Sequence, residues 1–128
     1  MILDSSAIVA VVLREPGYKD LLTKIAAAEK IAVGAATAAE AAIVLSAKSG
    51  TDGRLLISQI LRSFDVELVP FDEAQYFTAV GAYQKFGKGR HKANLNFGDC
   101  LSYALARERS ETLLYVGSDF SKTDLPAI

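Results

Sequence analysis

The feature that most constrains the fold of this 128-residue chain is a regular change between short apolar runs and longer segments of helical periodicity. The short runs predict strands at 1–3, 30–33, 66–69 and 113–116. Apolar residues at three- and four-residue spacing predict helices at 5–14, 17–29, 37–49, 51–64, 72–86 and 96–109, with a loop at 87–95. Strands that alternate with helices favour right-handed crossovers. The sequence therefore predicts an α/β fold, with a central, mostly parallel β-sheet flanked by α-helices, in a single domain over residues 1–128.

The amino-acid composition excludes several classes of protein and of functional site. A hydrophobic content of 51% argues against disorder, and a net charge of −1 shows no overall preference for nucleic acid, so such binding needs a local basic patch. The longest apolar run, 7–13, is too short to cross a bilayer, and no signal peptide is expected. The single cysteine, Cys100, excludes an internal disulfide and fits a reducing cytoplasm, where we expect it to be a core residue rather than a nucleophile. The single His91 cannot build a histidine-rich zinc site.

Four acids stand where a predicted strand ends or a predicted helix begins: Asp4, Glu40, Asp99 and Asp119. In a parallel α/β domain these positions line the crevice outside the carboxyl ends of the strands. Two bare carboxylates ~4 Å apart repel each other by roughly 4 kcal/mol at an effective dielectric near 20. Four converging acids therefore need a proton or a cation. A hard divalent cation, Mg²⁺ or Mn²⁺, suits such oxygen ligands and indicates phosphodiester chemistry.

Each of these acids also has a purely structural alternative. Glu40 stands three residues after Thr37, as in a capping box. Asp99 lies in the first turn of its predicted helix, where an acid complements the helix dipole. Asp4 and Asp119 each precede a segment that they can cap. Taken singly, both interpretations stand; taken together, the pattern favours one metal-binding crevice.

The hydroxyl of Ser6, two residues after Asp4, bears on the type of chemistry. It can orient a metal-bound water or an acid, or it can be an ordinary serine at a helix start. Phosphatases of the haloacid dehalogenase type place a second aspartate at this position as acid and base, so an aspartyl-phosphate mechanism lacks its proton donor here. Metal-activated water is favoured instead. A small-molecule phosphatase and a catalytically idle RNA-binding module of the same fold remain as alternatives.

Four basic residues gather just before the helix that carries Asp99: Lys85, Lys88, Arg90 and Lys92. The interspersed glycines predict a flexible loop, and charges on such a loop are usually only solvated. Beside an acidic metal crevice, however, Lys88, Arg90 and Lys92 are candidates for binding RNA phosphates. The segment lacks the Gly-Lys-Ser/Thr of a P-loop, so nucleotide triphosphate binding is not expected.

The chain resembles the PIN-domain ribonucleases, and among them the VapC toxins of prokaryotic toxin–antitoxin pairs, in four segments: MILDSSA (1–7), AAEA (38–41), KGRHKANLNFGDCLSYALA (88–106) and GSDFSKTD (117–124). The third segment is quite specific, whereas the first alone is weak. The resemblance implies a Mg²⁺- or Mn²⁺-dependent endoribonuclease that acts on tRNA or another structured RNA. It also implies a small cognate antitoxin, VapB-like, that holds the enzyme inactive, and a homodimer.

The resemblance also places functional residues. The acidic positions of the family fall on Asp4, Glu40, Asp99 and Asp119. Its hydroxyl position falls on Ser6. It implies metal binding by Asp4, Asp99 and Asp119, with Glu40 and Asp119 positioning waters. Asp124 is a second acid near the carboxyl end that can share or replace the role of Asp119.

Two predicted helices, 5–14 and 37–49, are apolar on nearly every side. Helices of this kind are normally buried, and packing of the two against each other is one explanation. Apolar area left over predicts a docking groove for a partner helix, beside Glu40. A partner there can place an Arg or Lys in the acidic crevice and displace the metal.

Overall fold

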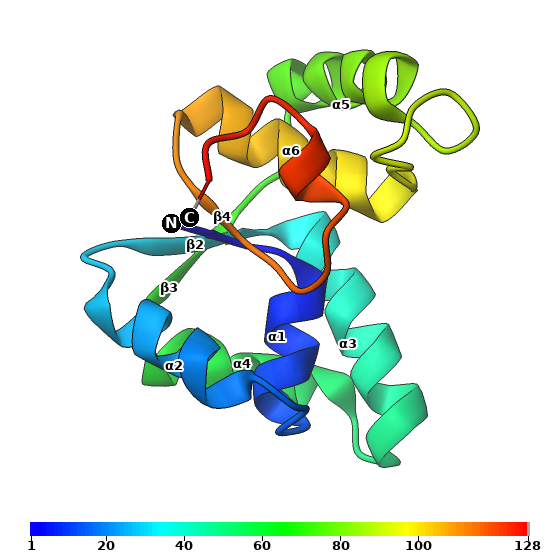
Figure 1. Cartoon of the computed structure of the whole chain (residues 1–128). Coiled ribbons are helices and arrows are strands. Elements are labelled where there is room, and N and C mark those ends of the chain that lie inside the picture. The colour runs from blue at the N-terminus through cyan, green and yellow to red at the C-terminus, as the bar shows by residue number, and fades with distance from the viewer. Residues whose placement is uncertain (128) are drawn as a thin grey trace.

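The computed structural model describes residues 1–127, which form a four-stranded sheet with helices on both faces (Figure 1). The strands are β1 (Ile2–Leu3), β2 (Ile31–Gly34), β3 (Val66–Val69) and β4 (Leu113–Leu114). The helices are α1 (Ser5–Val12), α2 (Tyr18–Ala27), α3 (Ala35–Ser49), α4 (Gly53–Ser63), α5 (Glu73–Phe86) and α6 (Phe97–Arg109), followed by a 3-10 turn, η1 (Phe120–Lys122). Neighbouring strands are parallel, in the order β3-β2-β1-β4. The predicted fold class is confirmed.

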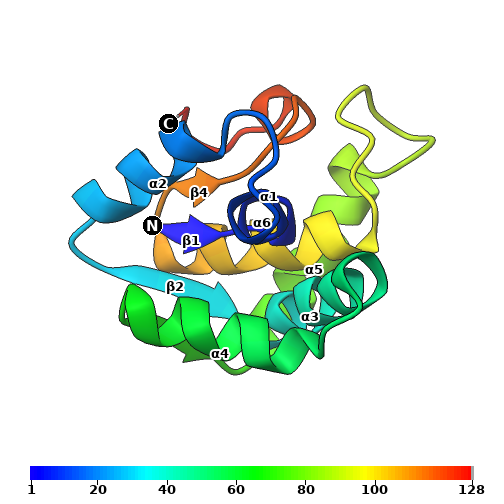
Figure 2. The ribbon, with the colours of Figure 1, turned by 90° about the horizontal axis from the view of Figure 1, so that it is seen from below.

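The sheet separates two hydrophobic cores because successive strand side chains point to opposite faces. Ile2 and Leu113 belong to the core built with α5 and α6. Leu3 and Leu114 belong to the core built with α1, α2, α3 and α4. Figure 1 shows α5 and α6 above the sheet and α1, α2 and α4 below it, and Figure 2 views the lower group from beneath. The carboxyl ends of the parallel strands therefore share one edge, where the loops to the helices begin.

The start of α3 differs from the prediction. The helix begins at Ala35, directly after β2, and its N-cap is Gly34, which offers no side chain. The expected capping box of Thr37 and Glu40 is therefore wrong. Thr37 lies two residues inside the helix and is buried. The strand leads straight into the helix, so a local Thr-x-x-Glu motif does not mark its first turn.

The starts of α5 and α6 follow the prediction more closely. Asn96 and Asp99 form a complete capping box: the Asn96 side chain accepts from the Asp99 N–H at 2.9 Å, and the Asp99 side chain accepts from the Asn96 N–H at 3.0 Å. Asp72 caps α5 by accepting from the Gln75 N–H at 2.9 Å. The Gln75 side chain donates to the Pro70 carbonyl rather than to the Asp72 backbone, so Asp72 and Gln75 do not form a complete capping box.

Other element ends shift by one to three residues. α1 ends at Val12 rather than at 14, because Arg14 has a positive φ of 53° that a right-handed helix cannot include. α4 begins at Gly53 because Asp52 accepts from the backbone of the next turn. α2 is shorter than predicted at both ends, and β4 stops at Leu114, two residues early.

The two apolar helices are explained largely by their own packing. α1 is buried from Ala7 to Val11 and contacts both α2 and α3, so the packing of α1 against α3 is the correct explanation for their shared face. On α3 the outward residue Ile43 stays 71% exposed, so an apolar surface remains on that helix. Despite this apolar character, no helix within residues 1–127 has both the length and the hydropathy to cross a membrane.

Candidate active site

Asp4 lies at the carboxyl end of β1 and caps α1. Its side chain is buried, and its Oδ2 accepts from the Ser6 N–H at 3.0 Å and from Ser6 Oγ at 2.6 Å. Its Oδ1 accepts from Ser102 Oγ at 2.6 Å. Ser6 Oγ in turn accepts from the Val116 N–H at 3.0 Å, just beyond β4. The structural role as a cap is therefore real, and the same bonds fix the direction of the Asp4 carboxylate.

Asp99 is half-buried in the first turn of α6 and is the electrostatic centre of the cluster. Burial raises the pKa of its carboxyl group to about 6, against the hydrogen bond from the Asn96 N–H, which lowers the pKa. The charges of Asp4, Asp119 and Glu40 raise the pKa of Asp99 further. Glu40 comes from α3 and Asp99 from α6, whereas Asp4 directly follows β1 and Asp119 lies after β4. The fold therefore brings the four predicted acids into one electrostatically coupled group.

The side chains of Glu40 and Asp119 do not cap a helix. The Glu40 carboxylate lies directly against the first turn of α6, where a Cβ on Gly98 would sit 2.3 Å from Glu40 Oε2. Only a glycine permits this approach to the helix N-terminus, whose dipole favours an anion. Asp119 is exposed at the start of η1, and its side chain makes no capping hydrogen bond there. The structural alternatives for these two acids are therefore wrong.

Asp124 is held elsewhere, so the structure does not support its sharing or replacing the role of Asp119. It accepts a hydrogen bond of 2.7 Å from Tyr103 Oη and lies 3.4 Å from Arg107 and 3.7 Å from Lys85. Burial alone would raise the pKa of Asp124, but the Tyr103 bond and the charges of Arg107 and Lys85 lower it. This acid anchors the carboxyl-terminal segment to α5 and α6.

The donor set suits a divalent cation of a particular kind. Carboxylate oxygens are the ligands preferred by Mg²⁺ and Mn²⁺, and a cation would offset the repulsion that acts on Asp99. Among residues 1–127, no three His, Cys, Asp or Glu side chains are grouped closely enough to enclose an ion. Mg²⁺ usually keeps several waters and takes only one or two carboxylates. The arrangement therefore fits a hydrated ion better than an all-protein cage.

The basic loop after α5 is tied at both ends. The Lys88 N–H donates to the Leu95 carbonyl at 2.8 Å, and the Leu95 N–H donates to the Phe86 carbonyl at 3.0 Å. Ala93 and Leu95 are fully buried and hold the loop against the body of the protein. The loop leads directly into the capping box of α6, which places it beside the acids.

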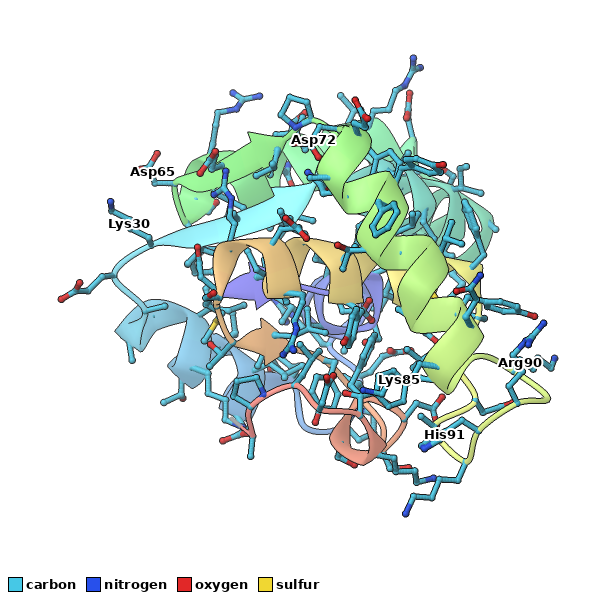
Figure 3. The ribbon with its side chains drawn as sticks, turned by 90° about the horizontal axis from the view of Figure 1, so that it is seen from above. Lys30, Asp65, Asp72, Lys85, Arg90 and His91 are labelled. Carbon is cyan, nitrogen blue, oxygen red and sulfur yellow. The ribbon has the colours of Figure 1, made fainter. Side chains whose placement is uncertain are left out.

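The basic side chains of this loop project outward. Lys88, Arg90 and Lys92 are exposed, and none of them forms an ion pair within the part of the chain that the structure describes. Figure 3 shows Arg90 at the opposite end of the molecule from Lys30, which precedes β2, and the Arg90 guanidinium lies 5.8 Å from the centre of the Tyr83 ring on α5. The positive charges therefore lie near the carboxyl ends of the strands. Lys85 differs, because it is paired with Asp124.

Ser102 and Thr37 were missed by the sequence reasoning. Ser102 holds Asp4, and Thr37 lies 3.4 Å from Ser102 between the hydroxyl oxygens. A signal was present: Ser102 follows Asp99 by three residues, and Thr37 precedes Glu40 by three, which is the spacing of one helix face.

Known proteins match this chain both in sequence and in structure. A family model for the PIN domain matches residues 1–125. Ribonuclease VapC of Mycolicibacterium smegmatis is 38% identical over 128 residues, covering 100% of this chain and 99% of that protein. The chain belongs to the PIN domain family, within its VapC group. Ribonuclease VapC36 of Mycobacterium tuberculosis is 38% identical over 126 residues, 98% of this chain and 91% of that one. VapC20 of the same organism, a toxin that cleaves the sarcin–ricin loop, shares the fold with a TM-score of 0.81 at 15% identity, over 99% of this chain and 97% of that one.

The acid cluster should make the stability of the metal-free protein depend on pH. The folded-state pKa of Asp99, about 6, lies above its ordinary value of 3.8. Folded protein therefore holds this proton more tightly than unfolded protein, and stability falls as pH rises from about 4 to about 6. In Asp99→Asn the new side chain carries no charge, and its amide oxygen can still accept from the Asn96 N–H. In chelator, this variant should melt at a higher temperature than the parent at about pH 7.5, and this advantage should vanish below about pH 4.

Thermal unfolding across this pH range measures the effect. Glu29→Gln, which removes an exposed acid outside the cluster, is the control and should show no comparable pH-dependent gain. An Asp99→Asn change in melting temperature that is the same at both pH values would contradict the coupling.

Proposed function

We propose that this chain is the toxin of a type II toxin–antitoxin pair, a Mg²⁺- or Mn²⁺-dependent endoribonuclease that hydrolyses phosphodiesters of tRNA or another structured RNA. The observation that carries the proposal is the placement of the acids: Asp4 directly follows β1, and Glu40 lies against the first turn of α6, which bears Asp99. Burial raises the pKa of Asp99, and the charges of Asp4, Asp119 and Glu40 raise it further. Relatives over the whole chain are named ribonuclease VapC, and a protein of the same fold cleaves the sarcin–ricin loop.

Each acid has a distinct role in this proposal. Asp4 and Asp99 would hold the cation, and Asp119 would bind it through one of the waters that it keeps. When bound, the cation lowers the pKa of its water and neutralises charge that develops on the phosphoryl oxygens. Glu40 and Asp119, which cap no helix, orient the attacking water and accept its proton. Ser6 fixes the Asp4 carboxylate through its 2.6 Å hydrogen bond.

The basic loop supplies the contacts to the RNA backbone. Lys88, Arg90 and Lys92 are exposed beside the start of α6, so their charges can face phosphates that flank the scissile bond. Such contacts position the strand without reading its sequence. We place this activity in the cytoplasm, where the single buried Cys100 stays reduced.

The products of cleavage test this chemistry. Attack by a water oriented by the acids leaves a 5′-phosphate and a 3′-hydroxyl. The alternative, attack by the 2′-hydroxyl of the RNA, needs a paired acid and base, and the only histidine, His91, uses its Nδ1 to accept from the Ala93 N–H. End-group analysis of a labelled RNA cut by the purified chain should report 5′-phosphates. A 2′,3′-cyclic phosphate would overturn the mechanism.

A phosphatase that forms an aspartyl-phosphate is less well supported. Both oxygens of Asp4 accept hydrogen bonds of 2.6 Å in a buried position, which leaves a poor nucleophile. Ser6, at the place of the second aspartate, is bonded to Asp4 rather than free to transfer a proton. An idle RNA-binding module has no use for acids that repel phosphate. Parallel assays on a single-stranded RNA panel and on a generic phosphate ester separate the three functions.

We also propose a VapB-like antitoxin as the protein partner. One chain of a toxin–antitoxin complex from Klebsiella pneumoniae has the same fold, with a TM-score of 0.73 at 15% identity, over 99% of this chain and 95% of that one. The negative charge of the acids around Asp99 favours binding of a cationic inhibitor. An Arg or Lys placed beside Glu40 would relieve the carboxylate repulsion and displace the metal. A small protein encoded by a neighbouring gene should then suppress toxicity when it is co-expressed.

A homodimer would cover the apolar face formed by α3, α5 and α6. Two adjoining grooves of about 620 and 470 Å³ meet at Phe97, which is 73% exposed. Their apolar lining includes Phe71, Tyr76, Val80, Tyr83, Leu101 and Ile43. Monomeric proteins rarely leave such a continuous apolar face open. A second copy fits it because a two-fold dimer buries the same face on both subunits.

A charge on this face should disrupt the dimer. Val80 on α5 is 48% exposed, so Val80→Glu should fold normally but place a carboxylate in the interface. Light scattering after size exclusion should report a dimer for the parent and a monomer for Val80→Glu. Leu55→Glu on α4, outside this face, is the control and should remain dimeric. A monomeric parent at micromolar concentration would contradict the dimer.

A further inference from the structure

Three buried polar side chains form one hydrogen-bonded chain beneath the acid cluster. Asp4, Thr37 and Ser102 are each at most 3% exposed. Ser102 Oγ donates to Asp4 Oδ1 at 2.6 Å, and Thr37 Oγ1 lies 3.4 Å from Ser102 Oγ. Hydroxyls buried in an apolar core need partners, and here the partner at the end of the chain is a carboxylate of the candidate site.

The donor and acceptor of each hydrogen bond in this series follow from the single hydroxyl proton that each of Thr37 and Ser102 carries. Ser102 has one hydroxyl proton, and it goes to the Asp4 carboxylate, so Ser102 Oγ can only accept from Thr37. The bonds therefore run from Thr37 to Ser102 to Asp4. Asp4 Oδ1 is tied to α6 in this way, while its Oδ2 is tied to Ser6 on α1. With both oxygens fixed, the carboxylate cannot turn about its side-chain bonds.

The hydrogen bonds among Thr37, Ser102 and Asp4 also connect the elements that carry three of the acids. Ser102 lies one helical turn after Asp99 on α6, and Thr37 lies one turn before Glu40 on α3. The bond from Ser102 to Asp4 thus sets the separation between Asp4 and the turn that bears Asp99. We propose that Ser102, supported by Thr37, is a positioning residue that holds Asp4 at the spacing from Asp99 required to bind the divalent cation. The inference rests on the metal-dependent function proposed above and deepens it.

The affinity for Mn²⁺, measured by calorimetry on the intact chain without RNA, tests this role. Loss of a group that orients a ligand typically weakens metal binding about 10- to 100-fold, so Ser102→Ala should show a loss of this size. Thr37→Val, which removes the hydroxyl at nearly constant volume, should weaken binding in the same direction, whereas Thr37→Ser should restore the parent affinity. Ile57→Val on α4 removes a buried methylene from a residue outside the hydrogen-bonded series Thr37–Ser102–Asp4, and it should lower the melting temperature without changing the affinity.

The outcomes of these binding measurements distinguish the positioning role of Ser102 from the proposed metal-dependent function. A folded Ser102→Ala that binds Mn²⁺ as tightly as the parent overturns the positioning role and leaves the proposed function intact. If Ser102→Ala does not fold, Thr37→Val decides in its place, and parent-like affinity in that variant overturns the role. A parent chain that binds no Mn²⁺ removes the proposed function and the inference with it.

Discussion

Asp99→Asn should lower the rate of RNA cleavage about 10²- to 10⁴-fold while the protein stays folded. In the proposed mechanism the removed carboxylate belongs to the group that would hold the cation. A cation that polarises a phosphoryl oxygen contributes several kcal/mol, and each 1.36 kcal/mol is worth about tenfold in rate. Asp4→Asn should have a similar effect, because Asp4 faces the same group. Single-turnover cleavage of a labelled RNA in Mn²⁺, with circular dichroism as the check on folding, measures the loss.

Asp124→Asn is the matched control. It also removes one aspartate carboxylate, but one bonded to Tyr103 outside the cluster, so its cleavage rate should stay close to that of the parent at temperatures where it is folded. A rate for Asp99→Asn within about twofold of the parent would exclude this acid from the chemistry.

Mn²⁺ should stabilise the parent chain substantially. A ligand that binds only the folded state at about 100 times its dissociation constant adds about 2.7 kcal/mol to the free energy of unfolding. For a domain of this size, that corresponds to a rise of several degrees in the melting temperature. The rise should be largely lost in Asp99→Asn, because the cation loses a ligand and the repulsion that it offsets. Thermal scans in chelator and in saturating Mn²⁺ measure both effects, and identical melting temperatures for the parent in the two conditions would contradict a metal site.

The fold could be read from the sequence because its main signals are local. Apolar runs and helical periodicity are set by neighbouring residues, and the capping box that Asn96 and Asp99 form at the start of α6 is a local motif too. The Thr37–Glu40 pair shows where this fails. The same motif stands inside α3, because β2 leads straight into the helix and Thr37 faces a buried hydroxyl of α6. That contact joins residues 65 positions apart, which no local pattern contains.

The placement of the four acids in the candidate site was predictable to a similar degree. Acids at strand ends are visible in the sequence because parallel strands bring their carboxyl ends to one edge. The choice between Asp119 and Asp124 was not visible, because it depends on the tertiary bond from Tyr103 that ties Asp124 away from the cluster. The spacing of Ser102 from Asp99 is visible in the sequence, but its hydrogen bond to Asp4 is not, because that contact joins residues 98 positions apart.

Mapping of RNA ends in cells tests the central claim, that these acids hydrolyse RNA, most directly. The parent chain and Asp99→Asn are expressed at equal levels from an inducible promoter, and all 5′-phosphate ends are sequenced before and soon after induction. The account predicts new 5′-phosphate ends at a small set of positions in the parent culture, absent with Asp99→Asn. No new ends with the parent, or the same new ends with Asp99→Asn, would contradict it.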